Sequence, residues 1–354
     1  MKYSKKYMNL EKGLKTEWII TNGLGGYAAS SIIGANTRKY HGLLVAPLTP
    51  PAGRFLVLSK LDESIIIGDE KHDLYTNVCK NYISQGFKYL ETFQKDILPI
   101  FKYKIGDVQI VKTICMVHGS NTVQVYYKVR NGSQHSKLQL APVLNFRDFH
   151  EMNTNHNFEL KQEVKSNKIK LVIDNNIAHP VYMKISEGNY IEHFNDIFYN
   201  MFYIEEEKRG FFPEENHIVS GVFEIEIEPN EEKDICFLCS MEENIELARR
   251  FVEEQLVARG MIADLAIHDP KKAKDKIPNP HMHIMVPIRP LKEDGTWGQK
   301  QKKVPVLTPD GQPVLNQKGQ LVFRAVHPTD WSRKETLEEL RSAWAKMCNE
   351  LYEE

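Results

Sequence analysis

Residues 16–240 contain one short β-branched stretch after another, and this pattern constrains the fold more than any other feature of the chain. Residues 108–114, 168–173 and 221–228 alternate apolar with polar side chains, as strands with one wet face do. Turn-forming residues such as Asn131-Gly132 separate these stretches. Because many short strands at such spacing usually pack as two layers, we predict a mainly β protein whose first part is an antiparallel β-sandwich.

The pattern changes from strands to helical periodicity near residue 243. Residues 243–260 place apolar side chains at helical spacing and end in a glycine, and residues 332–352 predict a second helix with Ser332 as its N-cap. Thr308-Pro-Asp-Gly311 predicts a hairpin between them. We therefore predict two domains, at 1–243 and 244–354, of which the second is a partial α+β domain.

Composition says little about partners, but it does indicate the cellular compartment. The chain has 354 residues, a net charge of −1 and five cysteines. The near-neutral charge gives no overall argument for a nucleic acid or a membrane, and an odd, scattered set of cysteines is typical of a reducing compartment. The sequence predicts no signal peptide, and no apolar run reaches the ~18 residues that a membrane span needs. We expect a cytoplasmic protein with no membrane partner.

Three clusters of polar and aromatic residues in the first part are candidates for a sugar-contacting surface. The first follows a glycine-rich stretch at 23–26, which permits positive φ angles and close approach of backbones. The second lies at 145–150 and the third at 205–215. Each cluster alone also fits a structural role, because arginine–aspartate pairs commonly tie loops in β-sandwiches. On the functional interpretation, the predicted substrate-binding residues are Arg38, Tyr40, His41, Arg147, Asp148 and His150.

A resemblance to a known family is carried by three strings, TNGLGGYAASSIIGANTRKYHGLL, LNFRDFH and EEEKRGFFPEENHIVSGVFEI. They resemble the N-terminal domain of bacterial and archaeal glycogen debranching enzymes of the amylo-α-1,6-glucosidase type, over residues 16–243. The resemblance implies a β-sandwich associated with glycogen or a related α-glucan. In that family a following α/α-barrel supplies the acidic residues for hydrolysis. The residues after 243 do not resemble that barrel, so the resemblance implies a domain with no catalytic residues, whose six candidates contact the glucan or the barrel.

His281 and His283 are two positions apart in an apolar stretch, so a β-strand would place both imidazoles on one face. His268 ends another apolar stretch. Two ligands on one strand and a third on its neighbour make a three-imidazole metal site, which suits Mn, Zn, Ni or Co, and also Mg where a phosphate supplies oxygens. The lysines nearby form either a solvated loop or a phosphate-facing surface. On the second interpretation, the predicted DNA-binding residues are Lys300, Lys302 and Lys303.

A second resemblance is carried by the strings ARRFVEEQLVARGMIADLAIHDP, NPHMHIM, DGTWGQKQKK and PTDWSRKETLEELRSAWAKMCNELYE. They resemble relaxases of the MobA/MobL mobilisation family, HUH endonucleases that nick plasmid DNA at a transfer origin. The resemblance spans residues 246–354 and implies that His268, His281 and His283 bind a divalent metal, Mn or Mg, with single-stranded DNA as the partner. The family's tyrosine nucleophile precedes the metal strands. Tyr352 is the only tyrosine in this range and follows those strands, so we expect metal and DNA binding without nicking.

The two resemblances leave three functions open. The chain is a non-catalytic, glucan-associated debranching domain with a foreign tail, or a partial HUH-relaxase-like protein with a foreign head, or a fusion product without a selected function. The abrupt join near residue 243 points to the third as the chain's history. Whether the chain is an enzyme stays open, because neither parent's catalytic apparatus is expected to be complete.

Overall fold

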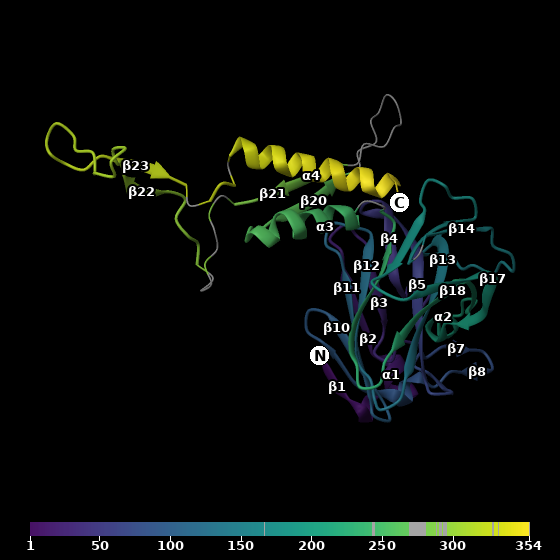
Figure 1. The fold of residues 1–354 in the computed structure, drawn as a ribbon. Coiled ribbons are helices and arrows are strands. Elements are labelled where there is room, and N and C mark those ends of the chain that lie inside the picture. The colour runs from purple at the N-terminus through teal and green to yellow at the C-terminus, as the bar shows by residue number, and fades with distance from the viewer. Residues whose placement is uncertain are drawn as a thin grey trace. The chain divides into compact units, whose positions relative to one another are not determined.

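Each of the two units of this chain has a hydrophobic core of its own. The units span Met1–Glu243 and Asn244–Glu354 (Figure 1). The computed structural model describes residues 1–165, 167–242, 245–268, 281–287, 289, 292, 296–327, 329–331 and 333–353.

The first unit is built from two large antiparallel sheets. The nine-stranded sheet has the order β1 (Lys2–Ser4), β9 (Leu90–Lys95), β10 (Pro99–Ile105), β11 (Val108–Met116), β12 (Thr122–Arg130), β19 (Glu232–Ser240), β16 (Val181–Ile185), β15 (Lys168–Ile173) and β14 (Leu160–Lys165). The ten-stranded sheet has the order β2 (Glu17–Thr21), β3 (Tyr27–Ser31), β4 (Gly42–Thr49), β5 (Ala52–Ile67), β13 (Ser136–Asp148), β18 (Glu214–Ile227), β17 (Asn189–Phe202), β7 (Val78–Cys79) and β8 (Tyr82–Ile83), with β6 (Glu70–Asp73) paired to β5.

Helical segments in this unit are short and only connect strands. They are η1 (Lys5–Tyr7), α1 (Leu10–Lys15), η2 (Gly86–Tyr89) and α2 (Ile204–Lys208). The prediction of a mainly β protein with an antiparallel first domain is confirmed.

Burial alternates along the strands as the sequence pattern predicts. Ile110 of β11 and Val125 of β12 are buried in the core, and Leu138 and Leu140 of β13 are buried with them from the ten-stranded sheet. Each of these strands therefore turns one face toward the layer between the sheets. Burial of apolar surface in that layer is the main force that holds the two sheets together.

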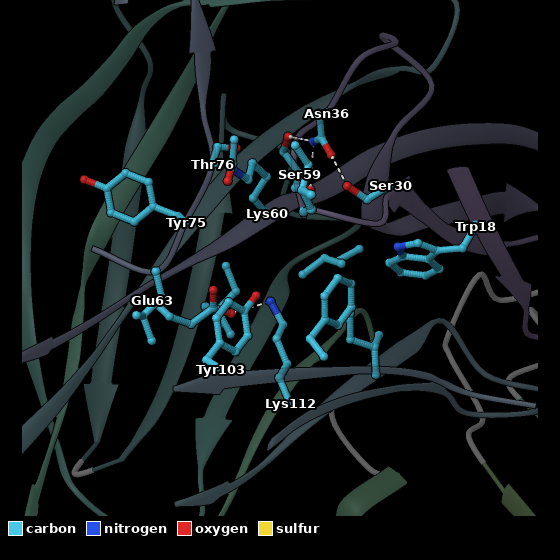
Figure 2. A pocket seen from close by; sticks show the side chains of 17 residues that line it. Trp18, Ser30, Asn36, Ser59, Lys60, Glu63, Tyr75, Thr76, Tyr103 and Lys112 are labelled. Atoms are coloured by element: carbon cyan, nitrogen blue, oxygen red, sulfur yellow. Dashed lines mark hydrogen bonds and ion pairs between the residues drawn. The ribbon is translucent and has the colours of Figure 1, made fainter. Parts of the chain in front are cut away.

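Polar groups also lie in the core. Glu63 of β5 accepts hydrogen bonds from Lys112 of β11 and from the Tyr127 hydroxyl of β12, the latter at 2.7 Å. Figure 2 shows Glu63 and Lys112 beside a small cavity that Trp18 and Tyr103 also line. The cavity volume is about 20 Å³, which is on the scale of one water molecule. It is therefore too small for a sugar, and the ion pair has a structural role.

The glycine-rich stretch forms the tight turn between β2 and β3. The Asn22 side-chain oxygen accepts hydrogen bonds from the backbone N–H groups of Leu24 and Gly26, both at 2.9 Å. Gly25 has a φ of 97°, and a Cβ atom there would lie 2.8 Å from the Pro51 carbonyl oxygen. Position 25 thus requires glycine for its backbone conformation and for a close backbone approach.

The second unit combines two longer helices with two-stranded ladders. Its elements are α3 (Ile245–Gln255), η3 (Val257–Arg259), β20 (Asp264–His268), β21 (His281–Met285), β22 (Lys302–Pro305), β23 (Phe323–Val326) and α4 (Lys334–Glu353). Both predicted helices are present. The first changes from α to 3₁₀ geometry after Gln255 and ends at Gly260, which has a φ of 80°. Ser332, the predicted N-cap of the second, lies outside the described residues.

The predicted hairpin at residues 308–311 is also present. Leu307 and Pro313 form an antiparallel bridge, and Thr308 N–H donates to the Gln312 carbonyl oxygen at 2.8 Å. A second turn of the same form follows at residues 316–320, which the sequence pattern was not used to predict. Among the residues that the structure describes, no helix is both long enough and apolar enough to cross a membrane.

Candidate functional site

The three polar clusters of the first unit meet around the loop at residues 37–41. The Lys39 ammonium donates a hydrogen bond to the carbonyl oxygen of His150, 111 residues further along the chain. Glu205 N–H donates to the Thr37 carbonyl oxygen at 3.0 Å, which adds the third cluster. The sheet pairings therefore bring together residues that the sequence shows only as separate groups.

Arg147 holds this loop from the side of the core. Its Nη2 donates to the Lys39 carbonyl oxygen and to Glu215 Oε2, both at 2.8 Å, and its Nε donates to Glu215 Oε1. Only 6% of the Arg147 surface is exposed. The contacts of Arg147 support a positioning role for its guanidinium, and the glucan contact assigned to it from the sequence stays a prediction.

Glu215 is surrounded by further polar partners. It accepts a hydrogen bond from the Tyr203 hydroxyl, which lies 3.2 Å from His217 Nε2. Burial by itself would raise the pKa of Glu215, but attraction to His217 when charged and to Arg147 outweighs burial and holds the pKa below its usual value. Burial lowers the pKa of His217 to about 4, so His217 is neutral near neutral pH and Arg147 is the charge that keeps Glu215 ionised there.

A cleft of about 400 Å³ opens beside the loop, against strands β2 and β3. All three candidates of the first cluster line it, together with Glu17 and Tyr27 from the two strands. The predicted residues Arg38, Tyr40 and His41 therefore share one concave surface, which is the usual setting of a ligand site.

The charges of Glu17 and Arg38 compensate each other within the cleft. Glu17 Oε1 accepts hydrogen bonds from Arg38 Nε at 2.8 Å and from the Thr37 hydroxyl at 3.0 Å, and lies 3.6 Å from His41 Nε2. Burial would raise the pKa of Glu17, but His41, Arg38 and Thr37 together lower it to about 2. The carboxylate is thus ionised throughout the neutral range and does not serve as a proton donor there.

The remaining candidates, Asp148 and His150, lie beside the loop at residues 37–41. The Tyr40 hydroxyl is 3.3 Å from His150 Nδ1, and the two rings meet edge to face at 5.7 Å. Asp148 Oδ1 accepts a hydrogen bond from the His150 backbone N–H at 2.8 Å. Asp148 therefore orders the backbone that carries His150.

Glu17 and Glu215, the two carboxylates that organise the site, were not among the predicted site residues, although Glu215 belongs to the third polar cluster. The structural alternative was arginine–aspartate pairing, but Arg147 pairs with Glu215 of β18 rather than with its neighbour Asp148. Glu17 stands next to the buried Trp18 in β2, and Glu215 lies in a polar stretch of β18 that the structure buries. The partner could not be chosen without the pairing of β13 with β18.

The strand register of the second unit brings the three histidine positions together. In the β20–β21 ladder, His268 pairs with His281, and Ala266 pairs with His283. Because directly paired residues share a face and alternate residues do too, positions 268, 281 and 283 lie on the same face. Met282 and Ile284 alternate with the histidines and pack against the core of the helices, so the histidine face is the other one. The side chains of His268 and His281 lie outside the described part of the structure.

The three lysines predicted to bind DNA lie at and just before a different ladder. Lys302 and Lys303 are exposed residues of β22, where they pair with Val326 and Ala325, and Lys300 precedes the strand. The structure thus places these lysines on an exposed two-stranded segment.

Comparison with known proteins divides the chain at residues 234–238, a few residues before the division between the two structural units. The model of the family described as "Glycogen debranching enzyme N terminal" matches residues 16–234, more than half of the chain. The chain belongs to this family. The model of the MobA/MobL family matches residues 238–354. The debranching-type unit is therefore followed by a MobA/MobL-type region.

Conjugal transfer and mobilization proteins are among the curated relatives that match part of the chain. A conjugal transfer protein TraA of Rhizobium radiobacter is 36% identical over 111 residues, which are 31% of this chain and 9% of the relative. A TraA protein of Agrobacterium fabrum is 42% identical over 82 residues, 23% of this chain and 7% of the relative. A probable mobilization protein MobA of Bifidobacterium longum is 29% identical over 124 residues, 30% of this chain and 21% of the relative. The chain thus spans only a small part of each relative.

Solved structures are similar to the chain only at a low level. A putative kojibiose phosphorylase from the human microbiome is 12% identical, with a TM-score of 0.30, and the match covers 70% of this chain and 29% of that one. A bacterial glucoamylase complexed with acarbose is 12% identical, with a TM-score of 0.25, over 65% of this chain and 31% of that one. Likenesses this low carry no argument about the function of the chain.

Proposed function

We propose that the debranching-type unit is a non-catalytic glucan-binding domain, and that the cleft beside the loop at residues 37–41 contacts an α-glucan. The observation that carries the proposal is a concave surface lined by all three candidates of the first cluster, with Tyr27, Tyr40 and the Glu17–Arg38 pair in its wall. The second and third clusters contact the loop beside this surface. Aromatic rings offer a flat apolar surface to a sugar, and fixed charged groups next to them orient its hydroxyls.

The electrostatics of the cleft favour binding over hydrolysis. A glycosidase needs a carboxylic acid with a raised pKa to protonate the glycosidic oxygen. Glu17 has the opposite property, because His41, Arg38 and Thr37 outweigh burial and lower its pKa to about 2. A carboxylate that is ionised at neutral pH and paired with Arg38 suits an acceptor of hydrogen bonds from sugar hydroxyls.

Affinity electrophoresis in gels that contain glycogen tests this function. We expect the full chain to be retarded, and Tyr40→Ala to weaken binding by about tenfold through loss of the ring. Tyr40→Phe keeps the ring and should bind nearly as well. Ile177→Ala changes a residue that is 75% exposed and does not line the cleft, and should migrate like the wild type. Unchanged mobility of the wild type in glycogen would overturn the proposal.

We propose a second function for the MobA/MobL-type region, which is to bind a divalent metal and single-stranded DNA. The supporting observation is the shared face of positions 268, 281 and 283. The donor set of three imidazoles fits Mn²⁺, and fits Mg²⁺ where a phosphate completes the coordination. When bound, such a metal would polarise a phosphate oxygen.

Thermal unfolding with and without Mn²⁺ tests the metal site. We expect Mn²⁺ to raise the melting temperature of the full chain, and His281→Ala with His283→Ala to abolish the rise. His327→Ala is the matched control, because His327 is exposed and lies outside the β20–β21 ladder. A rise that survives in the double variant would rule out this metal site.

The salt dependence of binding to a single-stranded oligonucleotide tests the lysines. Lys302→Ala with Lys303→Ala should lower the slope of log affinity against log salt by about 1.4, since each lost phosphate contact removes about 0.7. Lys318→Ala, in the turn at residues 316–320, is the control. An unchanged slope in the double variant would show that these lysines do not contact phosphates.

A further inference from the structure

Beside the cleft of the debranching-type unit lies a cluster of aromatic rings, which Tyr40 joins to the cleft. We call this cluster the aromatic platform and define it by Tyr40, Phe149, His150, Phe211 and Phe212. We propose that a linear α-glucan lies across the cleft and the aromatic platform together, so that Phe211 and Phe212 make the site selective for long chains over disaccharides. The proposal rests on the proposed function of the cleft and adds the class of glucan that it takes.

Tyr40 belongs to both surfaces and joins them. It lines the cleft, and its ring meets that of Phe149 edge to face at 5.5 Å. The Lys39 ammonium lies 5.3 Å from the centre of the Tyr40 ring and 5.8 Å from the centre of the Phe211 ring. One ammonium group thus lies close to both the Tyr40 ring of the cleft and the Phe211 ring.

The loop that carries Phe211 and Phe212 is fixed at both ends. Phe211 N–H donates to the Glu206 carbonyl oxygen at 3.0 Å, and Tyr203 N–H donates to the Pro213 carbonyl oxygen at 2.8 Å. The Glu206 side chain is fully buried and accepts a hydrogen bond from Lys39 N–H at 3.3 Å. The two phenylalanines are nevertheless 56% and 59% exposed. Exposed rings on an ordered loop lose little freedom when a ligand covers them.

The chemistry of the platform favours a sugar chain over an apolar protein segment. Cationic groups lie among the rings, with Arg54 5.5 Å from the centre of the Phe149 ring and Arg209 5.3 Å from the centre of the Phe211 ring. An apolar helix would take the Arg54 charge, whose Nε donates to the Gly25 carbonyl oxygen, and the Arg209–Glu206 ion pair out of water, which is costly. A glucan instead presents apolar C–H faces to the rings and hydroxyl groups to the charges between them.

Calorimetric titration of the full chain with maltose, maltoheptaose and glycogen tests the proposal. We expect maltoheptaose to bind about tenfold more tightly than maltose, because only the longer chain reaches the second pair of rings. Phe211→Ala with Phe212→Ala should reduce maltoheptaose affinity to that of maltose and leave maltose binding unchanged. Ile177→Ala serves as the control, and unchanged melting temperatures would show that the variants are folded.

The outcomes separate this inference from the function on which it rests. Equal affinity for maltose and maltoheptaose, or full maltoheptaose affinity in the double variant, would overturn the extended site while leaving the cleft as a glucan site. Equal loss of maltose and maltoheptaose binding in a folded double variant would also overturn it, since the two rings would then act in the cleft itself. Absence of binding to any of the three glucans overturns both proposals.

Discussion

Arg147 and Glu215 form a buried ion pair with two parallel hydrogen bonds, although 68 residues separate them in the sequence. The pair joins β13 to β18, and the second Nη2 hydrogen bond of Arg147, to the Lys39 carbonyl oxygen, fixes the loop that forms the wall of the cleft. One guanidinium thus ties two strands of the sandwich to the loop of the candidate glucan site.

Removal of that guanidinium should destabilise the first unit strongly. Arg147→Ala leaves Glu215 buried without its charged partner, and we expect a loss of about 3–5 kcal/mol in the free energy of unfolding. Arg130→Ala is the control, because Arg130 pairs with Glu232 at an exposed position and should cost no more than about 1 kcal/mol. Urea denaturation measures both, and equal losses in the two variants would contradict the structural role of Arg147.

His217 should make the first unit sensitive to mild acid. Burial lowers its pKa from 6.5 to about 4, so the unfolded chain binds a proton over this range that the folded chain does not. Stability is therefore retained above pH 6.5 and lost as the pH falls toward 4. Between pH 6.5 and about pH 5 we expect a loss of about 1–2 kcal/mol from this residue alone.

Replacement of the imidazole measures this contribution directly. We compare His217→Gln with the wild type by urea denaturation at several pH values. The variant should lose less of its free energy of unfolding than the wild type as the pH falls from 6.5 to about 5. The pKa of Glu215 is also held below its usual value, so its own contribution is lost only at lower pH. An unchanged slope in the variant would show that His217 does not titrate in this way.

Gly25→Ala should be more harmful than the same change at Gly34. Both glycines have positive φ angles, 97° and 73°, so both variants carry backbone strain of about 1 kcal/mol or more. Only at position 25 does a Cβ meet a backbone atom, the Pro51 carbonyl oxygen at 2.8 Å, while nothing lies within 4 Å at position 34. We expect a clearly larger fall in melting temperature for Gly25→Ala, and equal falls would argue against the close approach.

The Glu63–Lys112 pair should behave as a coupled unit in the core. Lys112→Met alone leaves a buried carboxylate uncompensated and should cost about 3–5 kcal/mol. The double variant Glu63→Leu with Lys112→Met removes both charges and should recover most of that loss. A double-mutant cycle of unfolding free energies measures the coupling, and additive effects would show that the two charges act independently.

Local patterns in the sequence were sufficient to predict the secondary structure and the class of fold. Alternation in strands such as β11, the turn residues at 308–311 and the helical spacing of α4 act within a few residues, so they can be recognised without knowledge of distant segments. The same local reasoning singled out the three residues of the first cluster, which all line the cleft.

Long-range strand pairing decided what these residues can do. Arg147 has Asp148 beside it in the sequence, yet the register of β13 against β18 gives it Glu215 instead. In the same way, only the register of β20 against β21 pairs His268 with His281. Side chains alternate between the two faces of any extended strand. Which residue of the neighbouring strand lies opposite a given residue is decided by the packing of whole sheets. The sequence by itself therefore determined the strands, the turns and the candidate side chains, and the tertiary structure alone decided which side chains meet.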